Sequence, residues 1–140
     1  MSDAHILIVD DDPAIRELLR RITERAGFTA HTAGDGMEAL ALLDQHRYAV
    51  LLLDLMMPRV NGYEVVEALK TAAHRPTVVI VSAMAGLSTR QLDTNIVHSV
   101  VHKPFDVEMV SQLLADTVRS VSEAGPLLAD MDDLPNRLIC

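Results

Sequence analysis

Cysteine, aromatic side chains and clustered positive charge are all scarce in this chain. Of its 140 residues one is cysteine (Cys140), none is tryptophan, and 3% are aromatic. A single cysteine excludes an internal disulfide and favours a reducing compartment, so we expect a cytoplasmic protein. Lys and Arg number 12 against 20 Asp and Glu, a formal net charge of −8, and no basic cluster breaks this balance. Because neutralising phosphates takes clustered Lys and Arg, direct binding to nucleic acid is not expected.

Long apolar stretches are missing as well. No run approaches the roughly 18 residues of a membrane span, and the first residues lack the basic and apolar regions of a signal peptide, so no membrane partner is expected. The chain is nevertheless 49% hydrophobic, which is too apolar for a disordered polymer. Its length suits one domain, whose core must be filled by Val, Leu, Ile and Met.

Short, unbroken apolar runs organise the sequence. Runs of this length, rich in β-branched residues, predict strands that are buried on both faces of a parallel sheet. They lie at residues 6–9, 50–53, 78–81 and 97–101, with a weaker alternating candidate at 28–33. Segments with helical character lie between and after them, at residues 13–26, 36–46, 62–73, 88–95 (short and polar) and 110–121.

The first helix carries clear end signals. Asp12 is a good N-cap before Pro13 at the first helical position, and Gly27 stands where a C-cap belongs. The alternation of strand and helix, five times over, predicts a doubly wound α/β fold with helices on both faces of a five-stranded parallel sheet. In this class the functional site lies at the carboxyl ends of the strands.

The amino-acid composition changes from Ser122 onward. We expect the domain to span residues 4–121 and residues 122–140 to form a tail, flexible or docked, with no separate effector domain. Gly125 and Pro126 are expected to break the last helix.

Three carboxylates fall at predicted strand ends. Asp10 and Asp11 follow the first strand and Asp54 follows the third. If these strands are neighbours, the carboxylates converge, and two unit charges about 4 Å apart repel by about 4 kcal/mol at an effective dielectric of 20. A hard divalent cation such as Mg²⁺ would offset that repulsion.

The last two strands end in complementary chemistry. Ser82 supplies a hydroxyl and Lys103 a cation, and Pro104 after Lys103 is a candidate for a cis peptide bond. An acid, a hydroxyl and a lysine all at strand ends point to a site that handles an anionic group such as a phosphoryl group.

Together these residues resemble a known family. The segments 9–13 (VDDDP), 53–62 (LDLMMPRVNG), 82–83 (SA) and 103–105 (KPF) look like the receiver domain of two-component response regulators, over about residues 4 to 121. The resemblance implies a flavodoxin-like sheet of order 2-1-3-4-5. That order is a property of the family, since the apolar runs alone leave the arrangement of the strands open.

What the resemblance implies is a phosphotransfer reaction. Asp54 would accept a phosphoryl group from a sensor histidine kinase or a histidine phosphotransfer protein, with Mg²⁺ (or Mn²⁺) as cofactor. The metal would be held by Asp10, Asp11 and Asp54 and by the backbone carbonyl of Met56. Phosphoryl oxygens would be bound by Ser82, Lys103 and the backbone N–H groups of Met56 and Ala83, and Pro58, Gly62 and Pro104 would have structural roles.

The same resemblance implies signalling through protein contacts. The chain would catalyse its own phosphorylation and dephosphorylation without turning over an external substrate, and would bind an unknown downstream protein when phosphorylated, as a monomer or a phosphorylation-dependent dimer. Val100 stands where many receivers carry an aromatic switch residue. Met56 and Met84 occupy positions that govern hydrolysis in the family, and predict a long-lived phosphorylated state.

Other interpretations stay open at this point. The chain is also consistent with the receiver part of a longer DNA-binding regulator, or with a receiver-like scaffold that works without phosphorylation. An aspartyl phosphatase of the haloacid dehalogenase type would need a second acid two residues after the nucleophile, where this chain has Met56.

Overall fold

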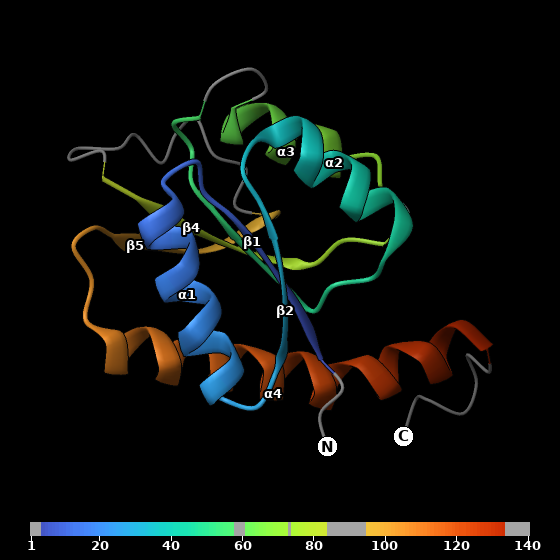
Figure 1. The fold of residues 1–140 in the computed structure, drawn as a ribbon. Coiled ribbons are helices and arrows are strands. Elements are labelled where there is room, and N and C mark those ends of the chain that lie inside the picture. The colour runs from blue at the N-terminus through green and yellow to red at the C-terminus, as the bar shows by residue number, and fades with distance from the viewer. Residues whose placement is uncertain (1–3, 58–60, 73, 84–94, 134–140) are drawn as a thin grey trace.

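Five parallel strands form a single sheet in the order β2-β1-β3-β4-β5 (Figure 1). The computed structural model describes residues 4–57, 61–72, 74–83 and 95–133, with side chains up to residue 120. The strands are β1 (His5–Val9), β2 (Thr29–Ala33), β3 (Val50–Leu53), β4 (Thr77–Ser82) and β5 (Val97–His102). The predicted sheet and its order are therefore confirmed, and β1 and β3 are neighbours in register from Ile6 opposite Val50 to Val9 opposite Leu53.

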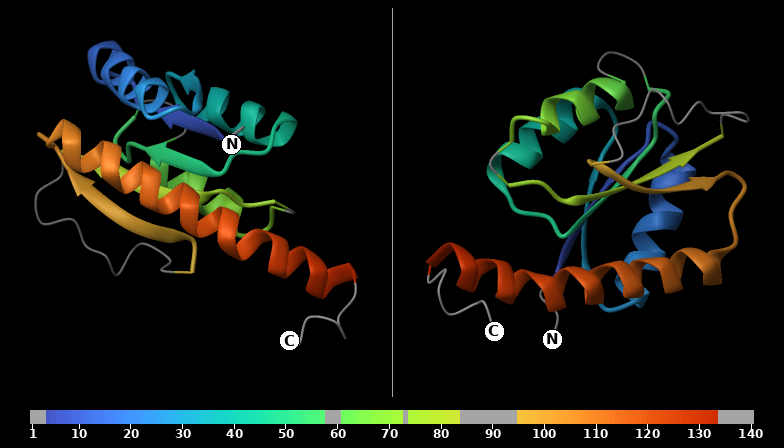
Figure 2. Two further views of the ribbon diagram at one scale, coloured as in Figure 1. Left: turned by 90° about the horizontal axis from the view of Figure 1, so that it is seen from below. Right: turned by 180° about the vertical axis from the view of Figure 1, so that it is seen from behind.

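Helices cover both faces of this sheet (Figure 2). They are α1 (Pro13–Arg25), α2 (Gly36–Gln45), α3 (Gly62–Leu69) and α4 (Val107–Asp133). α2 and α3 pack on the face that carries Leu7 and Val9. α1 and α4 pack on the other face, against Ile6 and Ile8. Because both faces are covered, the inner strands are apolar at successive positions rather than at alternate ones, and their polar residues His5, Thr77 and Ser82 lie at strand ends.

The helix ends follow the local chemistry of the sequence. Asp12 caps α1 by accepting a hydrogen bond from the backbone N–H of Ala14, and Pro13 is the first helical residue. Gly27 has a φ of 98°, the left-handed conformation expected just after a helix. Asn61 and Glu64 form a capping box at the start of α3.

The last helix differs from the prediction. α4 continues to Asp133, so the expected break at Gly125 and Pro126 is wrong. Proline inside a helix removes one backbone hydrogen bond and crowds the carbonyl four residues earlier, at a cost of about 3 kcal/mol, but its φ near −65° is a helical value, so the helix can continue through it. Good helix formers such as Ala124 and Leu127 flank it. Whether residues 122–140 act apart from the domain stays a prediction.

Other boundaries shift slightly or lie elsewhere. α3 ends at Leu69, earlier than expected. The expected helix at 88–95 and Pro58 and Met84 fall outside the described residues, apart from Asn95. Within the part of the chain that is described, no helix is long and apolar enough to span a membrane.

Candidate functional site

Backbone hydrogen bonds extend the sheet one residue past the strand ends and place the key side chains there. The Asp10 N–H donates to the carbonyl of Ala33 on β2 (3.2 Å), and the Asp54 N–H donates to the carbonyl of Val9 on β1 (2.9 Å). On the other side, the Lys103 N–H donates to the carbonyl of Ser82 (2.9 Å). These residues are therefore held by the parallel ladder itself rather than by a loose loop.

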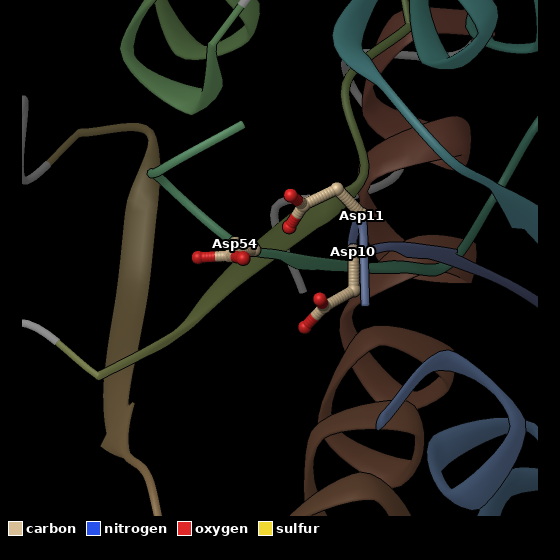
Figure 3. Close-up of side chains that lie close together, drawn as sticks. All are labelled: Asp10, Asp11 and Asp54. Atoms are coloured by element: carbon tan, nitrogen blue, oxygen red, sulfur yellow. The ribbon is translucent and has the colours of Figure 1, made fainter. Parts of the chain in front are cut away.

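The three carboxylates converge as predicted. Asp10 and Asp11 follow β1 and Asp54 follows β3, and they lie close together (Figure 3). One oxygen from each lies within 4.8 Å of the others. Asp10 and Asp54 are buried, whereas Asp11 is exposed. This combination of buried and exposed carboxylate oxygens fits a hard divalent cation that keeps several water ligands.

Lys103 is the counter-charge of the cluster. Its Nζ lies 2.8 Å from Oδ2 of Asp10 and 3.5 Å from Oδ2 of Asp54. The lysine thus bridges both buried acids and lies nearer to Asp10 than to Asp54. Burial lowers the pKa of Lys103, but the hydrogen bond and charge of Asp10, together with Asp54, raise it above its usual value.

The surroundings of Asp54 disfavour a negative charge on its side chain. Burial and then the negative charge of Asp10 raise its pKa from 3.8 to about 6, and Asp11 adds to the rise. A hydrogen bond from the backbone N–H of Met56 (3.2 Å) and the charge of Lys103 oppose it. Three carboxylates around one ammonium leave excess negative charge, which disfavours the ionised form of Asp54.

The other expected site residues lie at or just after the carboxyl ends of β3, β4 and β5. Ser82 ends β4 and is fully buried, and Ala83 follows it with an exposed side chain. The Met56 N–H already points at Asp54, whereas its side chain is 58% exposed. The bond between Lys103 and Pro104 is cis, as expected.

Gly62 has a specific steric role. A Cβ at this position would lie 2.5 Å from the carbonyl oxygen of Asp54 and 2.5 Å from the Cα of Leu55. Its N–H also donates to the carbonyl of Leu55 (3.0 Å). Since both crowded atoms belong to the backbone, only glycine lets α3 approach the chain this closely behind Asp54.

Two features of the site were not predicted from the sequence. Arg16 Nη1 donates to the carbonyl of Asp10 (2.7 Å), and Oδ1 of Asp10 accepts from the N–H of Asp12 (2.9 Å). Arg16 lies one turn after the cap residue Asp12, and this spacing is the feature of the sequence that could have predicted its contact with Asp10. Val100, at the position of the usual aromatic, lies in β5 and packs against the core on the α2 and α3 face.

Fold and site together define a doubly wound α/β protein with an acidic cluster and a lysine at the carboxyl ends of its strands. Residues 6–115 match the family described as the response regulator receiver domain, and the chain belongs to that family. Receiver domains bind Mg²⁺ at this acidic site and accept phosphoryl groups from histidine kinases or phosphotransfer proteins.

Known proteins resemble the chain in sequence and in fold. The response regulator MprA of Mycobacterium sp. (strain KMS) is 36% identical over 124 residues, which cover 86% of this chain and 54% of MprA. The chain therefore spans about half the length of that relative. The chemotaxis response regulator CheY4 of Vibrio cholerae has a TM-score of 0.75 at 27% identity, with 83% of this chain and 99% of CheY4 covered.

A further solved structure carries a ligand. The response regulator TrrA from Thermotoga maritima, in complex with Mg²⁺ and BeF, has a TM-score of 0.69 at 28% identity. The comparison covers 81% of this chain and 98% of that one.

Proposed function

We propose that Asp54 accepts a phosphoryl group from a phosphohistidine on a sensor histidine kinase or phosphotransfer protein. The observation that carries the proposal is the convergence of the buried Asp10 and Asp54 and the exposed Asp11 with Lys103 at one edge of the sheet. The three carboxylates repel one another, so they favour a bound cation, and the cation together with Lys103 favours an anionic phosphoryl group.

In the transfer, a carboxylate oxygen of Asp54 forms a bond to phosphorus as the bond between phosphorus and the donor's imidazole nitrogen breaks. The leaving imidazole, protonated at its other nitrogen, keeps the electron pair and departs neutral, and Asp54 becomes an acyl phosphate. Lys103 turns its ammonium to the phosphoryl oxygens. The Ser82 hydroxyl and the N–H groups of Met56 and Ala83 are the further donors.

The carboxylates fit a divalent metal ion. Asp10, Asp11 and Asp54 offer oxygens within 4.8 Å of one another, and the carbonyl of Met56 is the proposed fourth protein ligand. Bound Mg²⁺ or Mn²⁺ offsets the charge of the carboxylates and of the incoming phosphoryl group. The chain catalyses its own phosphorylation and dephosphorylation in this proposal, and turns over no external substrate.

The phosphodonor protein needs a surface beside the site. A cleft of about 680 Å³ lies between α1 and the first turn of α4, lined in part by Leu18, Ile22 and Val107. Leu18 is 37% and Val107 43% exposed, an apolar surface framed by charged side chains of both signs. The cleft lies on the two helices that begin directly after the acidic cluster and shortly after Lys103, so a protein seated on α1 and α4 covers the face of the domain that adjoins this edge of the sheet. Output follows through phosphorylation-dependent binding of a downstream protein.

The test is intact-mass spectrometry of the chain after incubation with Mg²⁺ and acetyl phosphate. We expect one added phosphoryl group that is absent in Asp54→Asn and absent when Mg²⁺ is chelated. A folded wild-type chain that gains no phosphoryl group from either acetyl phosphate or a panel of phosphorylated histidine kinases would contradict the proposal.

The docking surface is tested separately. Leu18→Ser should slow phosphorylation by a phosphorylated kinase and leave phosphorylation by acetyl phosphate unchanged, because the small donor does not need the cleft. Equal rates for variant and wild type with the kinase would exclude the cleft as the docking site.

A further inference from the structure

Three histidines and a tyrosine form a cluster at one edge of the sheet. The ring of His31 lies edge-to-face against three others, with ring centroids 5.4 Å from His5, 5.2 Å from His46 and 5.4 Å from Tyr48. Nδ1 of His31 and the hydroxyl of Tyr48 are also hydrogen-bonded, at 2.7 Å. His31 is therefore the centre of the cluster.

The cluster joins the edge strand β2 to three other parts of the fold. His5 begins β1, His31 lies in the middle of β2, His46 follows α2, and Tyr48 precedes β3. His31 is opposite Leu7 in the sheet register, so it projects on the face covered by α2 and α3. Since β2 has a neighbouring strand on one side only, these ring contacts are part of what holds it.

The arrangement does not suit a preformed metal site. Within the described residues, the aspartate cluster is the only group of three potential ligands whose donor atoms lie within 4.8 Å of one another. The imidazoles instead form a chain of edge-to-face contacts, an arrangement that aromatic rings favour through their quadrupoles.

The surroundings of His31 disfavour a positive charge. Burial and then the neighbouring imidazoles of His5 and His46 lower its pKa below the usual 6.5. Tyr48, the fourth ring, is itself buried. Among the described residues, the groups that shift the pKa of His31 are the imidazoles of His5 and His46, and none is a carboxylate.

Several charged groups of the adjoining elements pair with residues other than His31. Beside His46, Arg47 is hydrogen-bonded to His74 (2.8 Å), and Asp44 lines the same cleft as His46, Arg47 and His74. Glu38 of α2 binds the N–H of Gly34 at the far end of β2. α1 packs on the opposite face of the sheet, and its basic residues Arg20 and Arg21 pair with acids of the same helix.

We propose that this cluster is a proton-sensitive latch on strand β2, closed while His31 is neutral and loosened when His31 takes up a proton. A charged His31 stands between two other imidazoles in a half-buried place, where no carboxylate of the described residues acts on it. The contacts of β2 with β1 and with the segment before β3 then weaken. The latch is a second input to the domain, independent of phosphorylation.

The latch is connected to the acidic cluster through the backbone. Ala33, the last residue of β2, accepts the hydrogen bond from the N–H of Asp10 (3.2 Å). Loosening of β2 in acid therefore releases one of the bonds that place Asp10. The latch therefore adds a second effect of acid on the site to the protonation of Asp54, whose own pKa is about 6.

The sign of the pH effect follows from linkage. His31 binds its proton less tightly in the folded chain than in the unfolded one, so the contribution of His31 to stability falls as the pH falls below 6.5. The fall continues until the pH reaches the lower pKa of the folded state, and each pH unit in that window costs up to about tenfold in the ratio of folded to unfolded chain.

The experiment is urea unfolding of the full chain at a series of pH values from 7.5 to 4.5, for wild type, His31→Phe and the control His98→Gln. His31→Phe keeps a ring in the cluster and removes the proton, whereas His98 is an exposed imidazole on the other edge strand, β5. Wild type and His98→Gln should lose stability below pH 6.5 more steeply than His31→Phe. Equal pH profiles in all three chains would overturn the latch.

A second measurement on the wild-type chain covers the case in which His31→Phe does not fold. NMR titration gives the pKa of His31 directly, and amide hydrogen exchange compares the two edge strands. The latch requires a His31 midpoint below 6.5 and, in acid, a loss of protection in β2 relative to β5. A midpoint at or above 6.5, or equal changes in both strands, would overturn it.

Discussion

Replacing Asp54 by Asn should make the metal-free protein more stable at neutral pH. The carboxylate of Asp54 is buried beside Asp10 with Asp11 nearby, and Lys103 is shared with Asp10. Asparagine has nearly the same shape and keeps an oxygen to accept the hydrogen bond from Met56, but it carries no charge. The substitution therefore removes repulsion and keeps packing.

The magnitude follows from the pKa of Asp54. A rise from 3.8 to about 6 means that the ionised side chain destabilises the folded state. At 1.36 kcal/mol for each pKa unit, the cost at pH 7.5 is about 3 kcal/mol. Because the folded state binds this proton more tightly than the unfolded chain, the cost is absent below pH 3.8, grows as the pH rises toward 6, and is complete above it.

The assay is urea unfolding in the presence of EDTA at pH 7.5 and at pH 4, with Asp44→Asn as the control for loss of an exposed carboxylate. Asp54→Asn should gain stability at pH 7.5, little at pH 4, and the control should change little at either. Mg²⁺ should reduce the difference in stability between Asp54→Asn and wild type, since it stabilises the wild-type carboxylate cluster more than that of the variant. A variant that is no more stable than wild type at pH 7.5 in EDTA would refute the electrostatic reasoning.

Three further predictions test other parts of the structure. Gly62→Ala should destabilise the fold by about 1–3 kcal/mol in thermal unfolding, despite the better helix propensity of alanine, because its Cβ meets the backbone at Asp54; an unchanged midpoint would contradict the close approach. Asp12→Ala should cost about 1 kcal/mol by removing the cap of α1, and Asp12→Asn should restore it, as read from urea midpoints. The double variant Met56→Asn, Met84→Glu should shorten the lifetime of the phosphorylated state after removal of phosphodonor, and an unchanged decay rate would argue against control of hydrolysis at these positions.

Much of the fold could be predicted because the sequence signals were local and agreed with one another. Apolar runs marked the strands, and Asp12, Pro13 and Gly27 marked the ends of the first helix. The positions of Asp10 and Asp54 at neighbouring strand ends followed from those runs once the family's strand order was assumed.

What could not be predicted depends on contacts between distant segments. Lys103 lies closer to Asp10 than to Asp54. This preference depends on how far β1, β3 and β5 extend relative to one another along the strand direction. The crowding at Gly62 depends on how closely α3 approaches the chain after β3. The grouping of His5 and His31 depends on the register of the β1 and β2 pair, which residue spacing alone leaves open.

α4 is long enough to extend well beyond the sheet on which it packs. At about 1.5 Å per residue its 27 residues extend about 40 Å, whereas a strand of 6 residues such as β5 spans about 20 Å. The far half of the helix therefore projects past the sheet (Figure 2). A tilt of about 5° at the start of α4, a few residues after Lys103, moves the far end by about 3 Å, so a displacement too small to register beside Asp54 becomes a step of atomic size at the tip.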